Sequence, residues 1–160
     1  MRYKHIISIA AGLFLLVSCE SGDPAKQAVL DFTRALSDSS YVEAWDLLTP
    51  ESHQWYDSTV VILQRFGWVE AREAIEGLTG EMTEEDFNGL TGQGLFSRMV
   101  EASPEVHNLS SSMKSVSYPA DSLAVVVMRT EDGLQEVVIR RIEGVWVIDL
   151  ASLGPPVEGE

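Results

Sequence analysis

The sequence has very little cysteine, since Cys19 is the only one among its 160 residues. No disulfide can form within such a chain, so its stability has to come from a hydrophobic core. Basic residues are also scarce: 11 lysines and arginines stand against 25 acidic residues, and the net charge is −14. A surface this acidic repels phosphate backbones and anionic headgroups, which excludes nucleic acid as a partner. The simplest reason for the acidity is solubility.

Internal repeats are absent too, which excludes a solenoid or propeller. The composition, 45% hydrophobic and 22% charged, is typical of one globular domain. A chain of this length can bury about 68% of its unfolded surface, which is enough to fold without disulfides.

The chain lacks an apolar run long enough to span a membrane. Its longest such run, residues 6–17, would form a helix of about 18 Å, while the hydrocarbon core is about 30 Å thick. A short positive segment with Arg2 and Lys4 precedes this run. Together these features are typical of a secretory signal peptide, predicted here as residues 1–18.

The residues that end this segment are Leu16-Val17-Ser18-Cys19, and they resemble the bacterial lipobox. The resemblance implies that Cys19 receives a diacylglyceryl group and becomes the new N-terminus. Residues 19–23 would then be a lipidated tether, and the protein would be exported and anchored to a membrane of the bacterial cell envelope. Glu20 leaves the inner and outer membranes equally open. The alternative is an ordinary secretory signal followed by a free thiol.

The first part of the exported chain has helical periodicity. Asp23 and Pro24 are typical of a helix N-cap and first helical position, and Thr49 and Pro50 repeat this signature. A second short helix is expected between these two starts, from Tyr41. The apolar residues at helical spacing are Ala25, Ala28, Val29, Phe32, Ala35, Leu36, Ala44, Trp45 and Leu48.

Residues 51–105 are predicted to be helical as well. One helix carries Trp68, Ala71, Ile75 and Leu78 on a single face and stops at Gly80. Another starts at the segment 83–86 and runs to Glu101, with interruptions at Gly89, Gly92 and Gly94. The dipeptide Ser103-Pro104 closes this helical part.

The last part of the chain is rich in β-branched residues. Four strands are predicted, at Lys114–Tyr118, Leu123–Thr130, Leu134–Ile142 and Val145–Leu150. The short turns between them can join only antiparallel neighbours, so the sheet is a meander. The fold class is therefore α+β, with N-terminal helices on one face of a four-stranded antiparallel sheet.

The strand from Leu123 to Thr130 is apolar on both faces. A sheet covered on one side only would alternate apolar and polar residues more cleanly. We expect its second face to be covered either by the helical residues 52–106 or by another copy of the protein.

Two segments resemble a known family. Residues 36–51, which include Tyr41, Trp45 and Pro50, and the run from Asp121 to Leu150 are similar to small bacterial lipoproteins with an NTF2-like (cystatin-like) domain. The resemblance implies a curved sheet wrapped against the N-terminal helices, forming a cone with an apolar mouth. It implies one such domain over residues 24–160. The helical insertion at about 52–106 is longer than that family usually carries.

Candidate acids and bases are few. The candidates are His53, His107, Asp31 and Asp149. We expect both histidines to be solvated surface residues and Asp31 to lie off the apolar stripe of its helix. Asp149 shares a strand face with Val145 and Val147, so it could point inward, although a structural aspartate is favoured.

The spacing of these side chains predicts no catalytic set, cofactor or metal site. If the cone holds a pocket, the residues expected to line it are Phe32, Trp45, Trp146 and Asp149. Trp55 and Trp68, with Tyr56 and Phe66 nearby, are expected to fill the core, and a ligand-stacking cluster is the alternative.

These features lead to one hypothesis and two rivals. The hypothesis is a non-enzymatic envelope lipoprotein that binds a small apolar ligand or a protein partner. The first rival is an isomerase or dehydratase that uses Asp149 within the cone. The second is a structural subunit of an assembly, for which a homodimer is one form.

Overall fold

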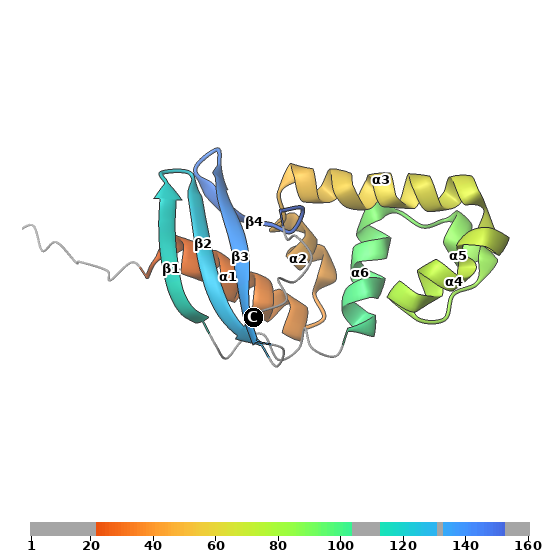
Figure 1. Cartoon of the computed structure of the whole chain (residues 1–160), viewed down its shortest axis with the longest axis horizontal. Helices are drawn as coiled ribbons and strands as arrows, with labels where there is room; N and C mark the ends of the chain where they lie inside the picture. The colour runs from red at the N-terminus through yellow and green to blue at the C-terminus, as the bar shows by residue number, and fades with distance from the viewer. Residues whose placement is uncertain (1–21, 104–112, 131–132, 153–160) are drawn as a thin grey trace, which may run out of the picture.

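The computed structural model describes residues 22–103, 113–130 and 133–152 (Figure 1). Cys19, His107 and the predicted signal peptide lie outside these ranges. Within them, six helices precede a four-stranded antiparallel sheet, which confirms the predicted α+β class. The elements are α1 (Pro24–Ser37), α2 (Tyr41–Asp46), α3 (Pro50–Phe66), α4 (Trp68–Thr79), α5 (Glu84–Asn88), α6 (Gly92–Ala102), β1 (Met113–Ala120), β2 (Leu123–Thr130), β3 (Gly133–Ile142) and β4 (Val145–Asp149).

The helices begin where the capping residues predicted. The Asp23 side chain accepts hydrogen bonds from two backbone N–H groups at the start of α1, and Thr49 does the same for one at the start of α3. Gly80 ends α4 with a φ of 75°, a conformation that favours glycine.

The stretch predicted as one interrupted helix from residue 83 contains two helices, α5 and α6. Thr83 and Thr91 each cap one of them: their hydroxyl oxygens accept from the N–H groups of Asp86 and Gly94, at 3.1 Å in both cases. The glycines at this junction therefore divide the segment rather than bend one helix.

The strands pair in chain order, β1-β2-β3-β4. Val126 lies opposite Val137, and Ile139 opposite Ile148, so that alternate residues share each face. The turn between β3 and β4 places Glu143 and Gly144 at φ values of 51° and 89°. Two positive φ values are the signature of a type I′ turn, which matches the twist of a hairpin.

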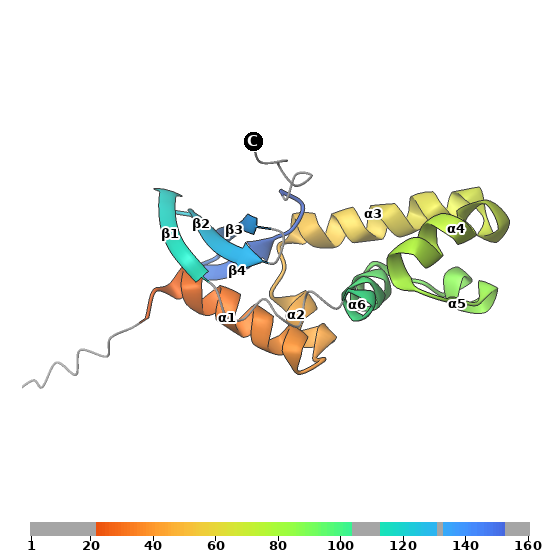
Figure 2. The same cartoon turned by 60° about the horizontal axis from the view of Figure 1, so that its bottom comes forward.

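The core extends from the space between α1 and one face of the sheet into the helices α3 to α6. Ala124, Val126, Ile139 and Ile148 are fully buried on the side toward the helices. Helix α1 contributes the predicted apolar stripe and packs against β2 and β4. Figure 2 shows α1 beneath the sheet, with the strands curving over it.

The edge of β4 that does not face β3 is hydrogen-bonded to the linker between α2 and α3. The Ile148 N–H donates to the Leu47 carbonyl at 2.8 Å, and the Thr49 N–H donates to the Ile148 carbonyl at 2.9 Å, so Leu48 forms a parallel bridge with Ile148. The Ser52 hydroxyl accepts from the Leu150 N–H at 2.9 Å. The linker therefore covers this edge of the sheet.

Helices α3 to α6 form the predicted insertion, which projects beyond the β4 side of the sheet (Figure 1). Helix α6 packs against α3, α4 and α2. It approaches α3 closely at Gly92, where a Cβ atom would lie 2.8 Å from the backbone nitrogen of Asp57. Gly92 therefore permits a close approach of α6 to α3, which any larger residue at this position would prevent.

This contact yields a matched pair of substitutions. We expect Gly92→Ala to lower the free energy of unfolding by about 1–3 kcal/mol, because α3 and α6 must separate. Gly77, inside α4, has no neighbouring atom within 4 Å of its ideal Cβ position, so Gly77→Ala should raise it by about 0.5–1 kcal/mol. Urea denaturation measures both, and a Gly92→Ala variant as stable as the wild type would contradict the close packing.

Candidate functional site

An aromatic cluster occupies the junction of α1, α2, α3 and α6. The Phe96 ring is its centre, with centroid distances of 6.5 Å to Phe32, 5.7 Å to Trp45 and 5.5 Å to Tyr56. Phe96 is 1% exposed and Phe32 is 7% exposed. The structure thus brings two residues of the tentative pocket, Phe32 and Trp45, to the same packed cluster.

His53 belongs to this cluster, and here the expectation of a solvated surface histidine was wrong. Its ring stacks on Trp45, with centroids 4.2 Å apart and planes 14° apart. Its Nε2 lies 2.8 Å from the Trp45 backbone oxygen. A carbonyl oxygen only accepts hydrogen bonds, so Nε2 carries the proton and donates it. His53 therefore ties α3 to α2.

Tyr56 lies on the buried side of the cluster. Burial raises the pKa of its hydroxyl to about 12, because the charged phenolate is disfavoured away from water. The hydroxyl therefore stays protonated at neutral pH and is a poor general base there. The packing of Tyr56 indicates a structural role.

Trp146 lies at a different place. It shares the helix-facing side of β4 with Ile148, and its ring forms a T-shaped contact with the Tyr118 ring at a centroid distance of 5.7 Å. The Tyr118 hydroxyl in turn donates to the Asp23 carboxylate that caps α1. Trp146 therefore belongs to the contact between the sheet and the start of α1.

Asp149, the fourth tentative pocket residue, is buried at 2% exposure on the opposite face of β4 from Ile148. Its carboxylate accepts from Arg140 Nε at 2.5 Å, from the Ser152 hydroxyl at 2.6 Å and from the Ser152 N–H at 3.1 Å. These partners anchor the chain just after β4. The four tentative pocket residues thus occupy three separate environments.

The environment of Asp149 keeps its carboxyl group ionised. Burial alone would raise its pKa, but hydrogen bonds from Ser152 and Arg140 outweigh burial and hold the pKa below its ordinary value. A general acid requires the opposite shift, toward neutral pH. The geometry of Asp149 thus resembles a structural ion pair more than a proton-transfer site.

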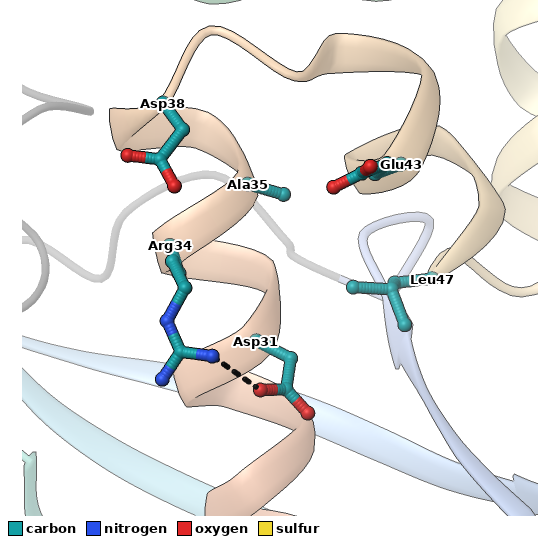
Figure 3. Close-up of a pocket in the computed structure, with 6 residues that line it drawn as sticks. All are labelled: Asp31, Arg34, Ala35, Asp38, Glu43 and Leu47. Carbon is teal, nitrogen blue, oxygen red and sulfur yellow. Dashed lines mark hydrogen bonds and ion pairs between the residues drawn. The ribbon is translucent and has the colours of Figure 1, made fainter.

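A small depression lies between α1 and α2 (Figure 3). Its volume is about 240 Å³, whereas small-molecule sites usually enclose about 300–1,000 Å³. Asp31 lies in it, half-buried, and pairs with Arg34 at 3.4 Å. The residues that line it are Asp31, Arg34, Ala35, Asp38, Glu43 and Leu47. Its charged rim is solvated and unsuited to an apolar ligand.

The aromatic residues of the insertion separate into two groups. Trp68 packs against Phe87 at 5.5 Å, and the Arg72 guanidinium lies over its ring. Trp55 and Phe66 are exposed instead, at 49% and 64%. Only Trp68 thus matches the expectation of a core residue among these three, and Leu78, predicted on the buried face of α4, is also exposed at 45%.

Several residues with decisive contacts escaped the sequence analysis. Arg140 and Ser152 hold Asp149, and Phe96 is the centre of the aromatic cluster. Ser52 is fully buried, and its hydroxyl accepts a hydrogen bond from the residue after β4. The only local sign of this role is that Ser52 follows the Thr49 cap by three residues, because Leu150, its main partner, is distant in sequence.

No protein-family model, curated protein or solved structure matches this chain. Over residues 22–103, 113–130 and 133–152, no three histidine, cysteine or acidic side chains gather as metal ligands would. No helix within the same ranges has the length and apolarity needed to cross a membrane.

The Asp149 contacts predict a pH-dependent stability. Because the folded-state pKa lies below the unfolded value of about 3.9, the ionised carboxylate stabilises the fold above that pH. This contribution disappears as the pH falls through the folded-state value. Asp149→Asn should therefore lower the free energy of unfolding by about 1–3 kcal/mol at pH 7, and the difference from the wild type should shrink near pH 3.

Urea denaturation at the two pH values measures this difference. Asp31→Asn is the control, because the Asp31 side chain is 42% exposed and its pair with Arg34 lies at the surface, so the change in stability should be no more than about 0.5 kcal/mol. A loss in Asp149→Asn that is equally large at both pH values would contradict the role assigned to the charge.

Proposed function

We propose that this chain is a lipid-anchored lipoprotein of the bacterial cell envelope whose domain binds a protein partner and catalyses no reaction. The segment Leu16–Cys19, at the end of a signal-sized apolar run, supports the anchor. An NTF2-like domain is part of the proposal, supported by helices on one face of a four-stranded antiparallel sheet.

The observation that carries the binding role is an apolar stripe along α3. Trp55, Ile62 and Phe66 are spaced by seven and four residues, so they lie on one side of the helix, and they are 49%, 53% and 64% exposed. Val69, at the start of α4, is a further exposed apolar side chain, at 82%. Large exposed apolar side chains gathered on one side of a helix are typical of interaction sites.

The stripe favours a protein over the other ligands considered. Phe32, Trp45 and Phe96 pack against one another where an apolar ligand was expected to bind, so the interior offers little support for a small molecule. The net charge of −14 opposes binding to anionic lipid. The ionised, fully hydrogen-bonded Asp149 gives no support to the enzyme alternative.

The anchor is tested by replacing the acylated residue. Wild-type protein expressed in a bacterium should fractionate with membranes, and its mass should exceed that of residues 19–160 by the lipid. Cys19→Ser should lose both the lipid mass and the cleavage that depends on it. A Cys19→Ser protein with the mass and the fractionation of the wild type would refute the anchor.

The partner surface is tested by photo-crosslinking in intact cells. A photoreactive amino acid at position 66 should give a discrete protein adduct. The same residue at position 42, which is 62% exposed on α2, serves as the control and should give none. Ile62→Glu should abolish the adduct at position 66, since a charge is costly to bury in an apolar contact.

An adduct of equal yield from both positions would show that the stripe has no special role. An adduct that persists in Ile62→Glu would also contradict the proposal. Both experiments use the full chain, so the anchor and the partner surface can fail independently.

A further inference from the structure

The sheet has a second apolar face, which points away from α1 and is called here the outer face. Strand pairing defines it: Val125 lies opposite Val138, and the alternating pattern places Arg140 and Asp149 on the same side. Its apolar side chains that are exposed in full or in part include Leu123, Val125, Val127, Val138, Ile142 and Val145, while Val147, near the end of β4, is buried.

No described helix covers the outer face. Helix α1 packs against the other side of the sheet, and α3 to α6 extend beyond the β4 side (Figures 1 and 2). Of the two covers expected for the second apolar face of β2, the described helices of the insertion therefore do not provide one. Leu134 and Val145, at the two ends of this face, remain 66% and 60% exposed.

The charges on the outer face are balanced, unlike those of the chain as a whole. Arg129 and Arg140 stand against Glu136 and Asp149, whereas the net charge of the chain is −14. Asp149 is already paired with Arg140. Two acidic molecules can therefore approach through this face with less repulsion than through an average part of their surfaces.

The outer face is also large enough for a pair of molecules. The strands have 8, 8, 10 and 5 residues, and at a spacing of about 4.8 Å they present roughly 500 Å². Two such faces bury roughly 1,000 Å² in total, which is the lower limit for a specific protein interface. Sheets commonly pack face to face in this way, about 10 Å apart.

We propose that the outer face is the interface between two copies of this chain, packed sheet against sheet. This dimer requires neither the lipid anchor nor the partner surface on α3. It accounts for the apolar residues on both faces of β2, because α1 covers one face and the second copy covers the other.

The test co-expresses two differently tagged copies of the full chain and solubilises them in a large excess of mild detergent micelles. Purification through one tag should recover the other copy. Val125→Glu in both copies should reduce this recovery by about tenfold or more, because it buries a charge at the centre of the interface. Val42→Glu, an exposed apolar position on α2, is the matched control and should leave recovery unchanged.

Circular dichroism establishes whether each variant is folded. Should Val125→Glu fail to fold, Val145→Glu replaces it, because this side chain is 60% exposed at a turn and tolerates a charge in the monomer. Recovery that is lost in the outer-face variant and kept in Val42→Glu supports the dimer.

Two results would overturn the proposal. Recovery that persists in both variants would place the contact elsewhere. A wild-type chain that recovers no second copy would leave the outer face to another segment of the same chain or to a different protein.

Discussion

The structure depends on the parallel contact between β4 and the linker before α3. Ile148 donates to one residue of this linker and accepts from another, while Ser52 accepts from Leu150, 98 residues away in sequence. The same few residues end α2, cap α3 and cover the β4 edge. Because the partners are so distant, these bonds form only when helices and sheet are both in place. The contact therefore makes the helical layer and the sheet one cooperative unit.

This constraint also determines which surfaces remain available. Fixed at its first turn, α3 leads away from the sheet, so the insertion extends the molecule rather than covering the outer face (Figure 1). The interior is occupied by Phe32, Trp45 and Phe96, and the chain after β4 is held by Asp149 and Arg140. Binding is therefore expected at the exterior, along α3 and on the outer face.

Local signals were sufficient to predict the elements, while distant contacts were not predictable. Caps such as Thr49 act on residues within one turn, and turns such as Glu143-Gly144 act between adjacent strands, so the strands, the sheet order and most helices followed from the sequence, although α5 and α6 were expected as one interrupted helix. The stacking of His53 on Trp45 and the pairing of Asp149 with Arg140 depend on how elements meet. The alternation in β4 placed Asp149 beside Val147 correctly. It could not show which face meets α1, because both faces of β2 are apolar.

We propose a lipid-anchored protein that has a filled interior and binds through its exterior. Native mass spectrometry of the chain extracted from bacterial membranes in mild detergent tests this proposal most directly, because one spectrum reports the lipid, the bound ligands and the number of copies. We expect a polypeptide that starts at Cys19, carries acyl chains and retains no other small molecule. A polypeptide without lipid, or one that retains a small organic molecule stoichiometrically, would contradict it.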